Sequence, residues 1–188
     1  MFSPMTNSDP SAVIRSPRHV ILCDETGRPH GTAELTAAHS GQGQLHLAFS
    51  VYIFRPDRRS LLIQQRSSAK PLWPLIWANT CCSHLREGES LLEAGRRRLR
   101  EEMDLDCELT VGPALVYRAV DPKSHGVEHE FDQILVGVSD CDPEPDPAEV
   151  AKWQWFDIAA LKRRMREQPK LFAPWFHLGL PKVLSQPC

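Results

Sequence analysis

The sequence predicts a single-domain α/β or α+β sandwich, in which mixed β-sheets are flanked by helices. Its 188 residues correspond to one domain at the usual size of about 150 residues. A hydrophobic fraction of 41% and a charged fraction of 24% are ordinary for a globular protein. Segments typical of strands come first, followed by one central helix, further strands and terminal helices, and this order favours sheets covered by helices. We expect the domain to span residues 18–188, because residues 1–17 are rich in Ser and Pro, as is typical of a disordered arm.

The sequence of the N-terminal half of the domain predicts three strands and one long loop. Residues 19–29 form a short strand closed by a turn, and a glycine-containing loop leads into a strong strand over 46–54. A further strand over 60–66 follows a turn that contains proline, so the last two strands are expected to form a hairpin. The stretch 71–84 is aromatic, proline-broken and non-periodic, which indicates a packed functional loop.

The C-terminal half begins with a helix over 90–103. Ser90 and Glu93 stand three residues apart, as in a capping box, at the start of this helix. An acidic, proline-rich connection follows later, at 142–150. The remaining expected elements are strands at 107–112, 114–120, 130–138 and 153–157 and helices at 158–168 and 173–184.

Charge and composition exclude several classes of partner. Lys and Arg number 22 and Asp and Glu number 24, so the formal net charge of −2 gives no reason to expect nucleic-acid binding. No apolar run approaches the roughly 18 residues that a membrane helix needs. The six cysteines form no CxxC pair, which favours a reducing compartment. We expect a cytoplasmic protein, monomeric or weakly homodimeric.

The segment GESLLEAGRRRLREEMDL, residues 88–105, resembles the Nudix box. In that superfamily the carboxylates at the end of the helix bind divalent metals that bridge the diphosphate of a substrate, in keeping with the preference of Mg²⁺ for carboxylate and phosphate oxygens. Arg98 stands where the first glutamate of the core pattern belongs, one turn before Glu102 on the same face. An arginine in place of this glutamate would suit a diphosphate that is bound but not hydrolysed. The alternative interpretation is a solvated helix with Arg/Glu pairs. The matching residues are Gly88, Glu89, Ser90, Glu93, Ala94, Arg97, Glu101 and Glu102.

Several further motifs extend from His19 to Leu184 in one order. They are HVILCDETGRPHGTAEL, AAHSGQGQLHLAFS, LLIQQRSSAKPLWPLIWANTCCSH, YRAVDP, GVEHE and APW. In this order and spacing the chain resembles the type I isopentenyl-diphosphate isomerases of the Nudix superfamily. The resemblance implies a Nudix-like fold. It also implies interconversion of isopentenyl diphosphate and dimethylallyl diphosphate, by protonation and deprotonation of the alkene through a tertiary carbocation.

The resemblance assigns roles to individual residues. It implies that Cys82 and Glu130 are the catalytic acid/base pair and that Tyr117 shares the proton. One divalent ion (Mn²⁺, Zn²⁺ or Mg²⁺) would be held by His39, His46, His84, Glu128 and Glu130. A separate Mg²⁺, bound with the substrate diphosphate, would be held by Glu102. The diphosphate contacts would be Arg66, Lys70 and Arg98, with Trp175 near the hydrocarbon end.

The same positions make sense from the residues alone. Glu128 and Glu130 are two apart, so on a strand both carboxylates point to one face. Three imidazoles and two carboxylates form a ligand set suited to Zn²⁺, Mn²⁺ or Mg²⁺, and a bound cation relieves the crowding of the carboxylates. A thiol of ordinary pKa, about 8.5, stays largely protonated at neutral pH and can donate a proton. An indole face can stabilise a passing positive charge.

Some departures from the family pattern leave room for a different activity. Leu35 stands where a lysine is common, Leu85 where proline is common and Asp104 where glycine is usual. A homologue that rearranges or cyclises another prenyl diphosphate would be compatible with these changes. Two further functions stay open: that of a Nudix diphosphohydrolase, against which Arg98 argues, and that of a metal-stabilised binding protein.

Overall fold

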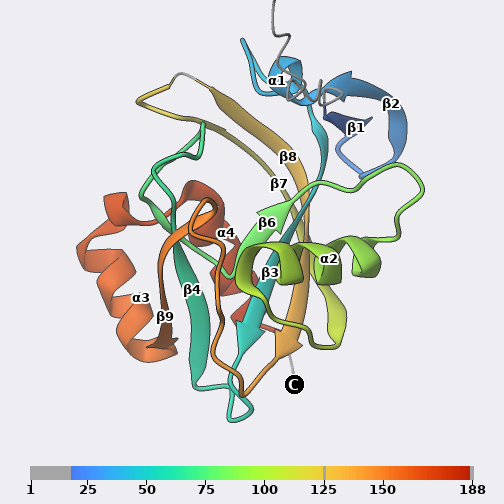
Figure 1. Ribbon diagram of the computed structural model, residues 1–188. Helices are drawn as coiled ribbons and strands as arrows, with labels where there is room; N and C mark the ends of the chain where they lie inside the picture. Colours follow the sequence, from blue (N-terminus) through green and yellow to red (C-terminus); the bar gives the residue numbers. More distant parts are fainter. Residues whose placement is uncertain (1–17, 125, 187–188) are drawn as a thin grey trace, which may run out of the picture.

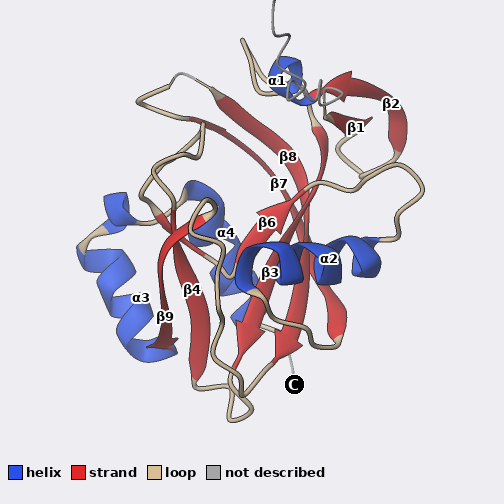
Figure 2. Ribbon diagram, in the orientation of Figure 1, coloured by secondary structure: helices blue, strands red, loops and turns tan. Residues whose placement is uncertain are grey.

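The computed structural model describes residues 18–124 and 126–186, so the arm predicted at residues 1–17 lies outside the described residues. Within these ranges a mixed sheet of nine strands is flanked by helices, which confirms the predicted fold class (Figures 1 and 2).

The centre of the sheet is β3 (His46–Phe54), which runs parallel to β8 (Val127–Val138). Their register begins with His46 opposite Glu130 and ends with Phe54 opposite Val138. On its other side, β8 pairs antiparallel with β7 (Leu109–Val120). The first rung of the central pair therefore joins two residues predicted for the functional site.

The other strands extend the sheet from β3. β1 and β6 pair antiparallel with β3, and β2 pairs with β1. β4 joins β3 through Phe54 and Leu61, as expected of the predicted hairpin, and then pairs with β5 and β9. These strands are β1 (His19–Cys23), β2 (Pro29–Glu34), β4 (Ser60–Arg66), β5 (Trp77–Ala78), β6 (Cys81–Ser83) and β9 (Val150–Asp157).

Helices cover both faces of the sheet (Figure 2). The helix α2 crosses one face in front of β3 and β6, while α4 lies behind the sheet (Figure 1). None of the helices in the described ranges is long and apolar enough to span a membrane. The helices are α1 (Leu35–Ala38), α2 (Leu91–Met103), α3 (Ile158–Glu167), a 3₁₀ turn at Pro169–Leu171 and α4 (Pro174–Leu184).

The strand β3 buries side chains on both of its faces. Tyr52 packs in one core cluster with Phe176 of α4, and Val51 packs in the other cluster with Leu99 of α2. This double burial explains why the strand is a continuous apolar run rather than an alternation. The side chains at its N-terminal end are thus carried on a fully packed element.

The helix α2 begins and ends as its sequence predicts. Ser90 Oγ accepts a hydrogen bond from the Glu93 N–H, and the Ser90 N–H donates to Glu93 Oε2 at 2.9 Å, which completes the capping box. At the other end Asp104 adopts a left-handed conformation, with φ of 49°, in the position where glycine is usual. The Nudix-box carboxylates are therefore held on a helix fixed at both ends.

Three segments differ from the prediction. The stretch 71–84, expected to lack regular structure, contains β5 and β6, and the segment 29–38 contains β2 and α1, which were not expected. The strands expected at 107–112 and 114–120 are one strand, β7. Its pairing with β8 shifts register between Val111 and Ala114, so the sheet accommodates the Gly-Pro pair between them as an irregularity rather than a break.

Candidate active site

A cavity of about 540 Å³ opens where β6, β7, β8 and the turn before β9 come together. His46 and Glu102 are buried beneath the wall, at 0% and 1% exposure, and contact residues that line it. The other predicted site residues line the cavity directly: His39, Arg66, Lys70, Cys82, His84, Arg98, Tyr117, Glu128, Glu130 and Trp175. The fold thus brings every residue predicted for the site to one place.

Three imidazoles converge at one end of this cavity. His39 follows α1, His46 begins β3 and His84 follows β6. One ligand atom from each histidine and one from Glu130 all lie within 4.8 Å of one another. His46 Nε2 lies 3.1 Å from His84 Nε2, and His84 Nε2 lies 3.2 Å from Glu130 Oε1. This is the kind of group that can hold a divalent metal ion.

Backbone carbonyls fix which ring nitrogen faces the cluster. His39 Nδ1 lies 2.7 Å from the Leu35 carbonyl, and His46 Nδ1 lies 2.7 Å from the Gln44 carbonyl. Because a carbonyl only accepts, both Nδ1 atoms must carry a hydrogen, and each Nε2 atom is the one that faces the cluster. Outer-shell hydrogen bonds of this type orient histidine ligands in metal sites. The residues present therefore fit a bound divalent cation.

The histidine cluster also places a positive charge next to Glu128. His39 Nε2 contacts Glu128 Oε2 at 2.8 Å. Burial opposes the protonation of His39, but the hydrogen bond and charge of Glu128 raise the pKa of this histidine to about 9. A metal ion that binds the ring would displace this proton. Glu128 thus supports the cluster through His39.

The two carboxylate oxygens of Glu130 face different groups. Oε1 faces His84 at 3.2 Å and His46 at 3.6 Å, whereas Oε2 accepts a hydrogen bond from the Tyr117 hydroxyl at 2.6 Å. Burial alone would raise the pKa of Glu130, but its contacts with the two histidines hold it well below the usual range. Burial and the charge of Glu130 raise the pKa of Tyr117 well above its usual value. One oxygen of Glu130 can therefore serve the cluster while the other faces a protonated phenol.

The thiol of Cys82 lies in the cavity wall on β6. Asn79 Nδ2 lies 3.2 Å from the sulfur, the Cys82 thiol can donate to Asn79 Oδ1 at 3.3 Å, and Ser50 Oγ lies at 3.4 Å. Burial, followed by the charge of Asp132, raises the pKa of Cys82 to about 12. The sulfur is therefore held as a thiol, which can donate a proton, rather than as a thiolate. The neighbouring Cys81 points to the opposite face and packs under α2.

Aromatic side chains form the apolar part of the wall. Trp175 is 3% exposed, and its ring lies 6.3 Å from the ring of Tyr117 and 5.4 Å from that of Trp73. The Trp175 Nε1–H donates to Asn79 Oδ1 at 3.1 Å. Arg66 lies 5.7 Å above the Trp175 ring and donates to the carbonyls of Leu72 and Trp73. An apolar substituent in the cavity would meet an indole face next to the thiol.

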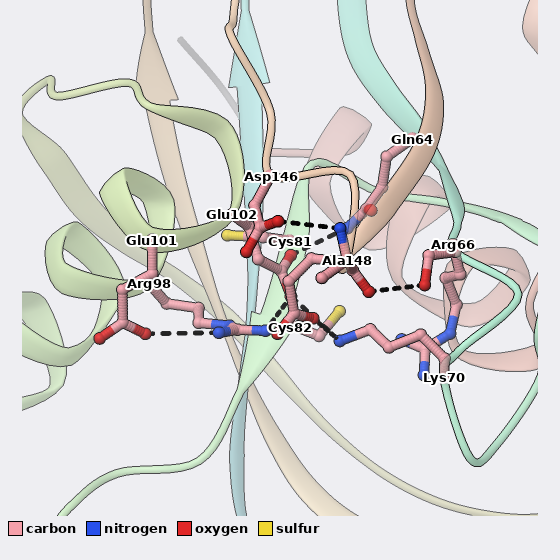
Figure 3. Close-up of polar contacts among 12 residues, drawn as sticks. Gln64, Arg66, Lys70, Cys81, Cys82, Arg98, Glu101, Glu102, Asp146 and Ala148 are labelled. Carbon is pink, nitrogen blue, oxygen red and sulfur yellow. Dashed lines mark hydrogen bonds and ion pairs between the residues drawn. The ribbon is translucent and has the colours of Figure 1, made fainter. Parts of the chain in front are cut away.

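Two cations and two carboxylates meet at the other end of the cavity, where Lys70 and Arg98 approach from opposite sides (Figure 3). Arg98 pairs with Glu102 and with Glu149, the latter at 2.8 Å, and Lys70 pairs with the same two carboxylates. Burial opposes the charge of Arg98, but Glu102 and Glu149 raise its pKa above the usual value. Gln64 Nε2 donates to Glu102 Oε2 at 3.0 Å. Arg98 thus points into the cavity. The alternative interpretation of a solvated helix would require it to point to solvent.

Sequence reasoning missed three residues of this site. Asn79 links the Cys82 thiol to Trp175, Asp132 accepts a hydrogen bond from Ser50 at 2.7 Å, and Glu149 pairs with the two cations. The only sequence signals were an asparagine before the cysteine pair, a third acid on the strand of Glu130 and an acidic turn before β9. Each is common in loops and strands without a functional role.

Comparisons with known proteins identify the family. The NUDIX domain matches residues 44–176. The isopentenyl-diphosphate Delta-isomerase of Nocardia farcinica is 43% identical over 156 residues, which cover 83% of this chain and 89% of that protein. The enzyme of the same name from Burkholderia multivorans is 46% identical over 164 residues, covering 87% and 92%. The chain belongs to the isopentenyl-diphosphate Delta-isomerase family of NUDIX proteins.

Solved structures agree with this family at the level of the fold. A crystal structure of a Deinococcus radiodurans protein has a TM-score of 0.70 at 18% identity and covers 88% of this chain and 99% of its own. A MutT NUDIX hydrolase from Burkholderia pseudomallei has a TM-score of 0.57 at 16% identity, covering 74% and 98%. Identities this low show the shared fold alone.

Two departures from the isomerase family pattern can now be placed. Leu35 begins α1 and lines the cavity, and its N–H donates to the Arg18 carbonyl at 2.7 Å. Arg18 lines the same cavity, so a cationic side chain stands beside the position where a lysine is common. Leu85 packs against the core cluster that contains Leu99 of α2 and is not among the residues that line the cavity.

Proposed function

We propose that this protein interconverts isopentenyl diphosphate and dimethylallyl diphosphate. The observation that carries the proposal is that Cys82 and Glu130, with Tyr117, line one cavity beside the indole of Trp175. Moving an unactivated double bond requires a proton donor and a proton acceptor on the same carbon skeleton, and exclusion of water from the carbocation. A protonated thiol and an ionised carboxylate in a largely buried wall meet this requirement.

We infer that the roles of the acid/base pair depend on direction. For isopentenyl diphosphate, the Cys82 thiol would give a proton to the terminal alkene carbon, and Glu130 Oε2 would accept a proton from the carbon next to the one that bears the diphosphate oxygen. Tyr117, hydrogen-bonded to that oxygen, would share or pass on the accepted proton. The tertiary carbocation would lie against Trp175, where cation–π attraction is worth up to about 2 kcal/mol in a desolvated site.

We further propose two sites for divalent metals. One ion, Mn²⁺, Zn²⁺ or Mg²⁺, would be bound by His39, His46, His84 and Glu130, with Glu128 in support. Mg²⁺ would be bound by Glu102 together with the substrate diphosphate, whose remaining charge Arg66, Lys70 and Arg98 would neutralise. The metals would supply positive charge, which favours the ionised form of Glu130 at one site and the bound diphosphate at the other.

Incubation with isopentenyl diphosphate in D₂O tests this function. We expect dimethylallyl diphosphate that carries deuterium in a methyl group, measured by NMR and mass spectrometry, because the Cys82 thiol exchanges with solvent between turnovers. Release of phosphate or diphosphate, assayed in the same samples, is expected to stay at background. Phosphate release without deuterated product would favour a diphosphohydrolase and contradict the proposal.

Arg98→Ala is expected to weaken the binding of a non-isomerisable diphosphate analogue about 10–150-fold. The reason is that a charge-assisted contact of this kind is worth about 1.5–3 kcal/mol. Arg98→Glu should weaken binding further, because it adds a third carboxylate next to Glu102 and Glu149. Inhibition constants measured for both variants check this result. Unchanged inhibition would remove Arg98 from the diphosphate site.

A further inference from the structure

The cluster of two cations and two carboxylates in the cavity has no net charge. Lys70 and Arg98 contribute two positive charges, and Glu102 and Glu149 contribute two negative charges. Each cation contacts both carboxylates, so each charge is neutralised by a partner in direct contact and not by distant charges. A polyanion that enters this end of the cavity meets cations that are already paired.

Glu149 is the member of this cluster that the proposed function leaves without a role. Its side chain is 23% exposed and lines the cavity, whereas Glu102 is 1% exposed and lies beneath it. Ser67 fixes the segment around Glu149, because its N–H donates to the Glu149 carbonyl at 2.9 Å and its Oγ donates to the Ala148 carbonyl at 2.6 Å. The carboxylate is therefore placed by the turn before β9, which is anchored to Ser67 directly after β4.

This arrangement distinguishes between two forms of the same ligand. A metal-free diphosphate carries its full negative charge and would have to displace Glu149 from Lys70 and Arg98, which leaves two anions side by side. A diphosphate that carries a divalent cation has less net charge, and its cation can pair with the carboxylate that Lys70 and Arg98 release. The energetic penalty from Glu149 is thus larger for the metal-free form.

We propose that Glu149 is a specificity-determining residue that makes this site select the metal-complexed diphosphate over the free diphosphate. The inference rests on the proposed function, since it takes the Lys70 and Arg98 end of the cavity as the diphosphate site. It adds a role for an acidic residue that disfavours the free diphosphate and tolerates the diphosphate that carries a cation.

Isothermal titration calorimetry with inorganic diphosphate tests the inference. The protein, with its tightly bound metal content intact, is titrated in buffer freed of Mg²⁺ by a chelating resin and again with excess Mg²⁺. For Glu149→Gln, affinity for the metal-free diphosphate should rise about fivefold or more, the effect of one unit charge at about 4 Å in bulk water. The gain with Mg²⁺ should be smaller, so the ratio of the two affinities should fall.

Two variants serve as controls. Glu101→Gln removes a carboxylate of the same charge that pairs with Arg98 from the solvent side, at 3.3 Å and 36% exposure, and it should leave the ratio unchanged. Glu149→Asp keeps the charge and should keep the Mg²⁺ preference. Melting temperatures of all variants establish that the fold is retained.

The outcomes separate this inference from the proposed function. If Glu149→Gln weakens both forms of diphosphate equally or leaves the ratio unchanged, Glu149 only positions the cations and the inference is wrong. If the unmodified protein binds no diphosphate in either buffer, the proposed function fails together with the inference.

Discussion

Replacement of Cys82 by alanine is expected to abolish isomerisation while the fold and the metal content stay intact. The thiol is held protonated in the cavity wall, with a pKa raised to about 12 by burial and by Asp132, and alanine offers no proton in its place. Loss of a positioned general acid typically costs about 10²–10⁴-fold in rate. Incorporation of deuterium from D₂O, measured together with metal content and melting temperature, checks the result.

The matched control is Cys81→Ala on the same strand. Cys81 is fully buried in the core cluster under α2 and faces away from the cavity, so its loss removes packing but no reacting group. We expect this variant to keep most of its activity and to show a lower melting temperature. Should the two substitutions show the reverse pattern of activity, the assignment of the catalytic thiol to Cys82 is wrong.

His84→Ala is expected to lose the stoichiometric ion of the histidine cluster and, with it, isomerase activity. His84 Nε2 contacts both His46 and Glu130, so its removal opens the centre of the donor set. Because changes to supporting residues alone cost about 10–100-fold in metal affinity, loss of an inner ligand should cost tenfold or more. Elemental analysis of the purified variant after dialysis measures the retained ion.

His129 provides the control for this experiment. It lies on β8 between Glu128 and Glu130, but its ring turns to the other face, where Nδ1 lies 3.3 Å from the Gly43 carbonyl. His129→Ala should therefore retain the ion. Full retention of a stoichiometric ion by His84→Ala would exclude His84 from the metal site.

The sequence predicted those elements whose ends and burial are encoded locally. The helix α2 was predicted because the capping box of Ser90 and Glu93 marks its start, and β3 because it is a long apolar run. In contrast, β2 is almost wholly exposed and follows no apolar pattern, and β5 spans only Trp77–Ala78. Such elements form because neighbouring strands offer them hydrogen-bonding partners, which the local sequence does not reveal.

In the candidate site, too, some residues could be predicted from local motifs and others could not. His39, Cys82 and Glu130 could be proposed because motifs of the isomerase family contain them, and the fold brings all three to one cavity. Asn79 and Glu149 depend on contacts between segments that are distant in the chain, such as that of Asn79 with Trp175. An isolated asparagine or glutamate carries no local sign of these contacts, so the structure was needed to find them.

The parallel pairing of β3 with β8 makes the proposed metal site a test of strand register. His46 stands directly opposite Glu130 on the first rung, and the ion proposed there would bridge the two strands. A slip of one residue would turn every side chain of a strand to the opposite face and separate the two ligands. An ion that binds only the correct register would therefore stabilise that register of the central sheet. Misregistered forms of the chain would be recognisable because they fail to retain the ion.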